Sequence, residues 1–203
     1  MVVTDRRLAA EAGHGLVPVV ASAVSAGARW VLLREKDLPA GQRRSLALDL
    51  VAVLGPVGAR LIVAGDAALA AEVGAAGVHL SATDPWPPAG RPAEASVVGR
   101  SCHGVDELRA ARREGATYAT LSPVFVTPSK PGYGPALGLD GLAAGCAAVP
   151  DLPVVALAGV GPGRAADCVA AGARGVAVMG EIMRSPDPAA VVRDLLAELA
   201  VRA

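Results

Sequence analysis

The sequence predicts a single (β/α)8 barrel, an α/β fold (TIM barrel) in which eight parallel strands alternate with helices. Short β-branched or apolar runs alternate with Ala- and Leu-rich helical stretches from one end of the 203-residue chain to the other. Four stretches repeat one pattern, in which a helix ends on glycine and a strand follows. The length suits one domain with a large core, and no linker or low-complexity tract divides it. We therefore expect residues 1–203 to form one barrel domain.

The expected strands are short and rich in Val, Leu and Ala, as is typical of strands that are buried on both faces of a parallel sheet. Helical stretches follow nearly all of them. The strands are expected at Val2–Thr4, Trp30–Leu33, Leu61–Ala64, Gly77–Leu80, Val97–Ser101, Tyr118–Ser122, Val154–Leu157 and Gly175–Met179.

Helices are expected where apolar residues recur at i, i+3 and i+4 with charges on the opposite face. The last helix shows this pattern at Val191, Leu195 and Leu199. Asp187 and Pro188 before it are typical of an N-cap followed by proline at the first helical position. The clearest helical stretches are Gly41–Leu54, Val105–Glu114, Arg164–Ala171 and Pro188–Ala200.

The internal repeat consists of SAGARWVLL, EVGAAGVHL, REGATYATL and AAGARGVAV. In each segment a glycine ends a helix, where a left-handed backbone is needed, and a strand begins after one or two small residues. These segments mark every second strand of an eight-unit repeat. A doubly wound open sheet is the alternative, but it would require a GxGxxG motif after the first strand, and the sequence has none there.

Composition limits the classes of partner. Lys and Arg number 19, Asp and Glu also number 19, and only five residues are aromatic. Nucleic-acid binding requires basic and aromatic surface, so neither a nucleic acid nor a membrane is an expected partner. No signal segment or membrane-spanning run is recognisable, and Cys102, Cys146 and Cys168 form no CxxC motif. We expect a cytoplasmic protein with reduced thiols.

In a barrel, functional residues lie where strands end and loops begin. The second strand is followed by Arg34 and Lys36, which are two cations at alternate positions that could bind phosphate or carboxylate. A solvated charge run at the start of a loop is the alternative. The fifth strand ends in Ser101, Cys102 and His103, without an acidic motif that would complete a nucleophilic triad.

The fourth strand contains His79 and leads to Asp84. A single histidine within a strand is more often a core residue than a catalytic one. Asp84 is either a metal ligand or the cap of a turn before Pro85.

The last three strand ends carry features that are typical of anion binding. The sixth strand leads into a loop with hydroxyls, glycines and one lysine, although an ordinary surface loop is the alternative. Glycines follow the seventh and eighth strands, where many barrels bind phosphate through backbone N–H groups. The candidates are Thr127, Ser129 and Lys130 in the loop and Gly159, Met179 and Gly180 after the last two strands.

Seven segments follow the order and spacing of one protein family over nearly the whole chain: VVTD, LLREKD, AAEVGAAGVHLSATD, VVGRSCH, LSPVFVTPSKPG, PVVALAGV and GVAVMGEIM. With them the chain resembles the thiamine phosphate synthase/TenI family. The resemblance implies a barrel, commonly a homodimer, that binds thiazole phosphate. In the synthase branch this compound is joined to a hydroxymethylpyrimidine diphosphate with Mg²⁺, and pyrophosphate is released. The TenI branch includes a thiazole tautomerase.

The resemblance also implies roles for the matched residues. Arg34 and Lys36 are similar to the diphosphate-binding pair, and Ser101 to a hydroxyl beside the reacting diphosphate. Asp84 is similar to one of two Mg²⁺-binding aspartates, if the chain is a synthase. Thr127, Ser129 and Lys130 are similar to the family's Thr-x-Thr-Lys loop, and Gly159, Met179 and Gly180 to its thiazole-phosphate backbone site.

The chain departs from the synthase pattern at two strands. Leu32 stands where the synthase has Gln, and the Asn-Asp-Arg after its third strand is replaced by Ala64, Gly65 and Asp66. A pyrimidine ligand and a Mg²⁺ ligand are therefore missing, unless Asp66 takes the metal position. These losses favour the TenI branch.

The tautomerase histidine is also missing, because Pro123 stands in its place. An acid–base group would then have to be His103 or His79. We expect His103, Ser101 and Lys130 to be the catalytic residues.

The sequence thus predicts a thiamine-biosynthesis enzyme that acts on thiazole phosphate, TenI-like in reaction and without a required cofactor. The alternative is a thiamine phosphate synthase that uses Mg²⁺. A second alternative is a catalytically silent thiazole-phosphate binder with a regulatory role. The expected partners are the small phosphate ester and a second copy of the chain.

Overall fold

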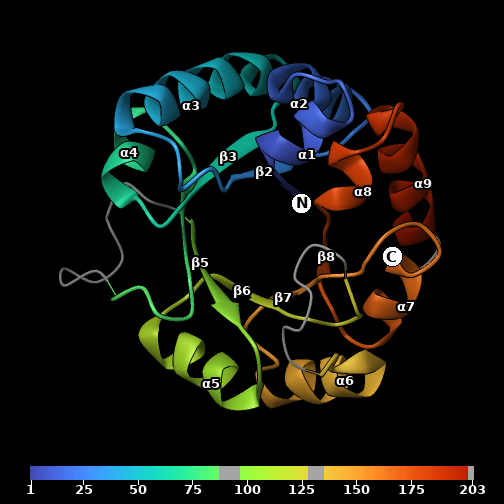
Figure 1. Ribbon diagram of the computed structural model, residues 1–203. Helices are drawn as coiled ribbons and strands as arrows, with labels where there is room; N and C mark the ends of the chain where they lie inside the picture. Colours follow the sequence, from blue (N-terminus) through green and yellow to red (C-terminus); the bar gives the residue numbers. More distant parts are fainter. Residues whose placement is uncertain (87–96, 128–134, 201–203) are drawn as a thin grey trace.

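A computed structural model describes residues 1–86, 97–127 and 135–200 of the chain. Eight parallel strands form one sheet in the order β1 to β8. Val2 pairs with Val31 of β2 and also bridges Val178 just after β8, so the sheet closes on itself. Val3 N donates to Val178 O at 2.9 Å across this junction. The predicted barrel is confirmed, with its helices arranged around the strands (Figure 1).

The strand bounds differ from the expected ones by at most two residues at an end. Three of the eight, β2, β4 and β7, have the expected bounds. The strands are β1 (Val2–Val3), β2 (Trp30–Leu33), β3 (Arg60–Ala64), β4 (Gly77–Leu80), β5 (Val97–Cys102), β6 (Tyr118–Leu121), β7 (Val154–Leu157) and β8 (Gly175–Ala177).

Among the described residues, helices follow every strand except β4, and the first and last strands are each followed by two of them. The helices are α1 (Arg6–Glu11), α2 (Leu16–Ser25), α3 (Ala40–Leu54), the 3-10 turn η1 (Gly55–Val57), α4 (Ala67–Glu72), α5 (Val105–Glu114), α6 (Gly138–Ala148), α7 (Ala165–Ala170), α8 (Gly180–Met183) and α9 (Pro188–Ala200).

Glycine and aspartate set the helix ends as the sequence predicts. Gly27, Gly74, Gly115 and Gly172 all have positive φ, from 66° to 117°, and precede β2, β4, β6 and β8. Asp187 Oδ1 accepts a hydrogen bond from Ala190 N at 2.9 Å and caps α9. These local signals fix where each helix stops, and hence how each even-numbered strand enters the sheet.

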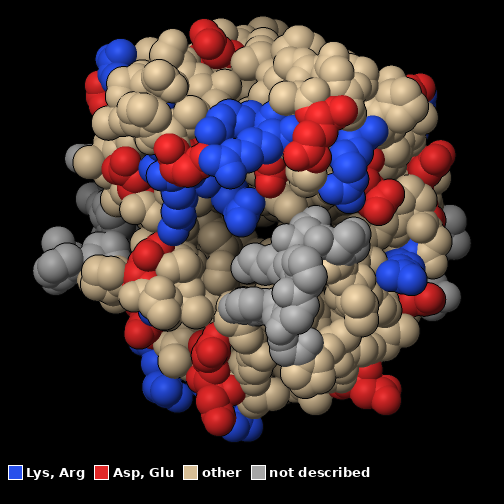
Figure 2. All heavy atoms as spheres, in the orientation of Figure 1, with Lys and Arg blue, Asp and Glu red and all other residues tan. Residues whose placement is uncertain are grey.

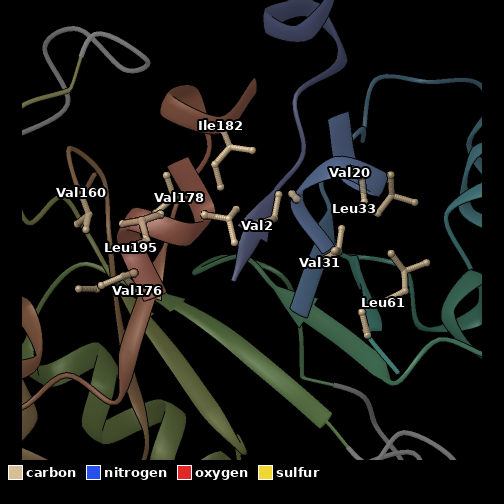
Figure 3. Packing of buried hydrophobic residues seen from close by; sticks show 14 of the residues in the cluster. Val2, Val20, Val31, Leu33, Leu61, Val160, Val176, Val178, Ile182 and Leu195 are labelled. Atoms are coloured by element: carbon tan, nitrogen blue, oxygen red, sulfur yellow. The ribbon is translucent and has the colours of Figure 1, made fainter. Parts of the chain in front are cut away.

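The core has one layer outside the barrel and one inside it. Val31 and Leu33 of β2 belong to the outer layer with Val20 of α2 and Leu195 of α9 (Figure 3). Leu32, between them in sequence, belongs to the inner layer, as the two-residue period of a strand requires. The buried members of the inner layer are Val3, Leu32, Ile62, Ala64, Tyr118 and Ala177.

Two further expectations concern thiols and membranes. Cys102, Cys146 and Cys168 are free, and burial raises the pKa of the Cys102 thiol to about 12. Within the described ranges, none of the helices combines the length and the apolar character that crossing a bilayer requires.

We expect Gly77→Ala to destabilise the barrel, because the pairing of β4 with β5 leaves no space for a side chain. A Cβ at Gly77 would lie 1.8 Å from Val97 O and 2.7 Å from Val97 C, which are backbone atoms of the neighbouring strand. The free energy of unfolding should fall by at least about 2 kcal/mol, as in overpacked cores. Chemical denaturation measures this quantity.

The matched control is Gly41→Ala in α3, where nothing lies within 4 Å of the added Cβ. This change should leave stability unaltered or raise it by up to about 1 kcal/mol, because alanine favours helix. Equal stabilities of the two variants would contradict the packing argument.

Candidate active site

The carboxyl ends of the strands surround a cavity of about 920 Å³. This volume is within the range of small-molecule sites. Figure 2 shows the cavity mouth as a hollow near the middle of the face. The end of each strand, or the segment just after it, supplies lining. Examples in the order β1 to β8 are Asp5, Arg34, Ala64, Ser81, Ser101, Ser122, Ala158 and Met179.

The described lining carries an excess of positive charge. Figure 2 shows Lys and Arg side chains gathered along one side of the hollow. Such an excess raises the local concentration of anionic ligands. The described part of the lining has six basic side chains and four acidic ones. The basic ones are Arg6, Arg7, Arg34, Lys36, Arg164 and Arg184, and the acidic ones are Asp5, Glu35, Asp37 and Glu181.

In the segment after β2, two acidic residues form close ion pairs with Arg6, whereas two cations lie farther from their carboxylate partners. Arg6 Nη1 lies 2.8 Å from Glu35 Oε2 and 2.7 Å from Asp37 Oδ1. Hydrogen bonds from Arg6 hold the pKa of Asp37 well below its usual value. Arg34 Nη1 lies 3.6 Å from its nearest carboxylate partner, Asp5. The two cations of the predicted diphosphate pair, Arg34 and Lys36, both line the cavity.

Lys36 occupies a space that Gly65 leaves open. Its Nζ lies 3.2 Å from Asp84 Oδ2. A Cβ at Gly65, whose φ is +68°, would lie 2.7 Å from that Nζ and 3.3 Å from Asp84 Oδ2. The ammonium group therefore stands beside Asp84 where a side chain at position 65 would begin.

Asp84 also closes a turn, as one of its two expected roles requires. Its Oδ2 accepts from Ser81 N at 2.8 Å, and its N donates to Ser81 Oγ at 3.2 Å. Burial opposes ionisation of this carboxyl, but the hydrogen bonds from Ser81 and Lys36 outweigh it and lower its pKa.

The described side chains do not fit a two-carboxylate Mg²⁺ site. Mg²⁺ prefers hard oxygen ligands, usually one or two carboxylates together with substrate phosphates. Asp66 instead caps α4 by accepting from Leu69 N at 2.9 Å, and its Oδ2 lies 3.5 Å from Arg43 Nη1. Asp84 already faces an ammonium. In residues 1–86, 97–127 and 135–200, no group of three or more His, Cys, Asp or Glu could hold a metal ion.

His79 is buried at the base of the cavity and bridges two hydroxyls. Its Nδ1 lies 2.8 Å from Tyr118 Oη, and its Nε2 lies 2.9 Å from Ser101 Oγ. Burial lowers the pKa of His79 to about 4, so the ring is neutral at physiological pH. His79 is thus both a core residue and a lining residue of the cavity.

His103 lies at the end of β5 and also lines the cavity. Its Nδ1 donates to Ser122 O at 2.7 Å, since a carbonyl oxygen can only accept. Its backbone N donates to Glu107 Oε2 at 2.8 Å. In the neutral ring Nε2 is then the acceptor nitrogen.

Two arginines that the sequence interpretation missed lie beside the predicted phosphate glycines. Arg164 Nη1 donates to Gly159 O at 2.9 Å, and its guanidinium lies 4.7 Å from the ring centroid of Phe125. A Cβ at Gly180 would lie 2.4 Å from Arg184 Nη2. Basic residues four or five positions after each glycine were the signal that could have found them.

Most of the predicted site residues meet in this one cavity, although their chemical roles stay predictions. Asp84 reaches it through its contact with Lys36. Ser129 and Lys130 lie outside the described residues. Those that line the cavity are Arg34, Lys36, Ser101, His103, Thr127, Gly159, Met179 and Gly180.

The family model described as thiamine monophosphate synthase matches residues 1–182. The chain belongs to this family. It is 39% identical to a putative thiamine-phosphate synthase of Geobacter sulfurreducens, over 98% of this chain and 93% of that protein. It is 38% identical to a thiamine-phosphate synthase of Roseiflexus castenholzii, over 96% of this chain and 85% of that protein.

A solved structure agrees with these relatives. The thiamine phosphate pyrophosphorylase from Pyrococcus furiosus superimposes with a TM-score of 0.87 at 27% identity, over 98% of this chain and 94% of that one. The family predicted from the seven motifs is confirmed. The names of these relatives favour the synthase alternative over the TenI-like reaction that the sequence interpretation placed first.

We expect the buried imidazole to make stability depend on pH. The pKa of His79 is about 4 in the folded chain, against 6.5 ordinarily, so between these values only the unfolded chain binds the proton. The stabilisation is complete above pH 6.5 and is lost as the pH falls towards 4, by up to about 3 kcal/mol. Denaturant unfolding at pH 7.5 and pH 5 measures the loss.

The control is His79→Gln, which keeps a polar side chain but does not titrate. Its stability should fall less than that of the wild type between the two pH values. The same loss in both proteins would show that other groups cause the pH dependence.

Proposed function

We propose that this chain is a thiamine phosphate synthase, which joins a hydroxymethylpyrimidine diphosphate to thiazole phosphate and releases pyrophosphate. One observation carries the proposal: Arg34, Lys36 and Ser101 line the same cavity as Gly159 and Gly180. Two anionic substrates can therefore lie side by side in it. The names of the relatives support this choice.

In this proposal the diphosphate binds to the cations that follow β2. Arg34 presents a planar guanidinium and Lys36 an ammonium, and both make strong charge-assisted hydrogen bonds to phosphate oxygens. Ser101 Oγ would be a third contact, from the end of β5. Their present partners, Asp5 and Asp84, would be exchanged for phosphate oxygens.

The thiazole phosphate would bind at the adjoining part of the wall, which follows β7 and β8. Backbone N–H groups near Gly159, Met179 and Gly180 need no side chain to approach a phosphate. Arg164 and Arg184, which line the cavity next to these glycines, would add positive charge. Gly159 has a φ of +66°, and a Cβ there would lie 2.6 Å from Phe125 Cβ, so this wall requires glycine for packing as well.

The reaction breaks the bond between the methylene carbon and the diphosphate oxygen, which keeps the electron pair. The thiazole nitrogen supplies its lone pair to the same carbon, and a C–N bond forms. No proton has to be transferred. Negative charge grows on the leaving pyrophosphate, and fixed cations lower the barrier by stabilising it. We assign this task to Arg34 and Lys36, because the described side chains do not fit a two-carboxylate Mg²⁺ site.

A tautomerase is the second candidate, and Gly65 is the observation that favours it. The synthase pattern has an aspartate at this position, and here Lys36 Nζ takes the adjacent space. His103 Nε2, as the acceptor of a neutral ring, could remove a proton from a bound thiazole.

We expect the purified chain to form thiamine phosphate and pyrophosphate in equal amounts when it is supplied with both substrates. Product analysis by chromatography, with and without added Mg²⁺, measures this activity. Isomerisation of the thiazole without condensation, abolished in His103→Ala, would establish the tautomerase instead. Binding of thiazole phosphate without any turnover would identify a silent binder.

We expect Arg34→Ala to weaken binding of inorganic pyrophosphate by about 10- to 100-fold, the value of one hydrogen bond to a charged group. Titration calorimetry measures the affinity. The control is Arg44→Ala, which removes an exposed arginine of α3 that pairs with Glu72 and does not line the cavity. Equal affinities of the two variants would exclude Arg34 from the diphosphate site.

A further inference from the structure

We propose that Tyr118 is a positioning residue, which fixes the tautomer of His79 and thereby makes Ser101 a hydrogen-bond donor to the ligand. The role rests on the proposed function only for the identity of that ligand. Tyr118 carries no expected role in the family resemblance. Its hydroxyl is the inner end of a hydrogen-bond network that runs from Tyr118 through His79 to Ser101.

Three adjacent strands supply the residues of this hydrogen-bond network. His79 of β4 is in register with Gly99 of β5, and Gly99 is in register with Tyr118 of β6. A Cβ at Gly99 would lie 2.4 Å from His79 Nδ1 and 2.2 Å from Tyr118 Cζ. The two rings therefore meet in the space that glycine leaves, with their centroids 5.4 Å apart. Ser101, two residues beyond Gly99 on the same face, lines the cavity.

The protonation states of Tyr118 and His79 give the hydrogen bonds of this network one direction. Burial raises the pKa of Tyr118, so the phenol keeps its proton, and burial keeps His79 neutral. Among the described residues, the hydrogen-bond partner of Tyr118 Oη is His79 Nδ1, at 2.8 Å. A buried hydroxyl donates where an acceptor is within reach, so Nδ1 accepts.

The neutral ring then carries its single proton on Nε2, which donates to Ser101 Oγ at 2.9 Å. The lone pairs of Oγ receive this bond, and the proton of Oγ is left to point into the cavity. A phosphate oxygen can only accept, so a ligand there requires a donor. In the other tautomer Nε2 would accept from Ser101, and the hydroxyl proton would turn away from the ligand.

The wild-type protein tests the tautomer without any substitution. Long-range ¹⁵N–¹H correlation spectra distinguish protonated from unprotonated imidazole nitrogens, and His79→Gln assigns the signals among the three histidines. We expect protonated Nε2 and unprotonated Nδ1 at pH 7. A proton on Nδ1 would overturn the proposal.

Tyr118→Phe removes only the hydroxyl and should release the tautomer. We expect the Nε2-protonated form of His79 to lose its dominance and the affinity for inorganic pyrophosphate to fall by about fivefold, the effect of one net hydrogen bond. Ser101→Ala should weaken binding at least as much. The double variant should be no weaker than Ser101→Ala alone, because Tyr118 acts through Ser101.

The matched control is Thr120→Val on the same strand. Thr120 Oγ1 is buried and has no hydrogen-bond partner among the described residues, so losing this hydroxyl should leave affinity unchanged. Additive losses from Tyr118→Phe and Ser101→Ala, or an unaltered tautomer in Tyr118→Phe, would refute the positioning role. Absence of thiamine phosphate formation with the expected tautomer and coupling would refute only the proposed function.

Discussion

The bridge between Val2 and Val178 closes the sheet into a ring, and the cavity depends on this closure. In an open sheet the ends of β2 and β8 would lie far apart. In the closed one Arg34 Nη1 reaches to within 3.9 Å of Met179 Sδ, although 145 residues separate them in sequence. Small and branched side chains make closure feasible, because the inner layer has room for few large groups. The proposed diphosphate and thiazole-phosphate regions are neighbours for the same reason.

Two glycines make room for polar contacts inside the closed barrel. Gly99 leaves the space in which His79 meets Tyr118, and Gly65 leaves the space that the Lys36 ammonium occupies. In both cases the absent side chain matters because a charged or hydrogen-bonding group from another strand, or from the segment that follows one, takes its place. A Cβ at either position would displace such a group, so backbone freedom is only part of the requirement for glycine, and at Gly99 the φ is not positive.

Local sequence signals predicted the fold closely, since the hydrophobic period and the C-cap glycines act within one element. They also placed Arg34 and Lys36 at the cavity, because the position after a strand decides which end of the barrel a residue occupies. The contact of His79 with Tyr118 could not be predicted, because it depends on the register of three strands. The sequence interpretation ranked the tautomerase above the synthase because of single departures such as Gly65. The family match over nearly the whole chain favours the opposite ranking.

The strength of each cation's existing contacts decides which cations can serve a ligand. Arg6 is held by two carboxylates at 2.7–2.8 Å, one of them on the buried Glu35, so releasing it would leave a buried charge unpaired. Lys36 and Asp84 are 45% and 28% exposed, and such a pair contributes at most about 1 kcal/mol. Arg34 is similarly exposed and lies 3.6 Å from Asp5. Lys36 and Arg34 can therefore exchange a carboxylate for a diphosphate at small cost, whereas Arg6 keeps the segment that carries them in place.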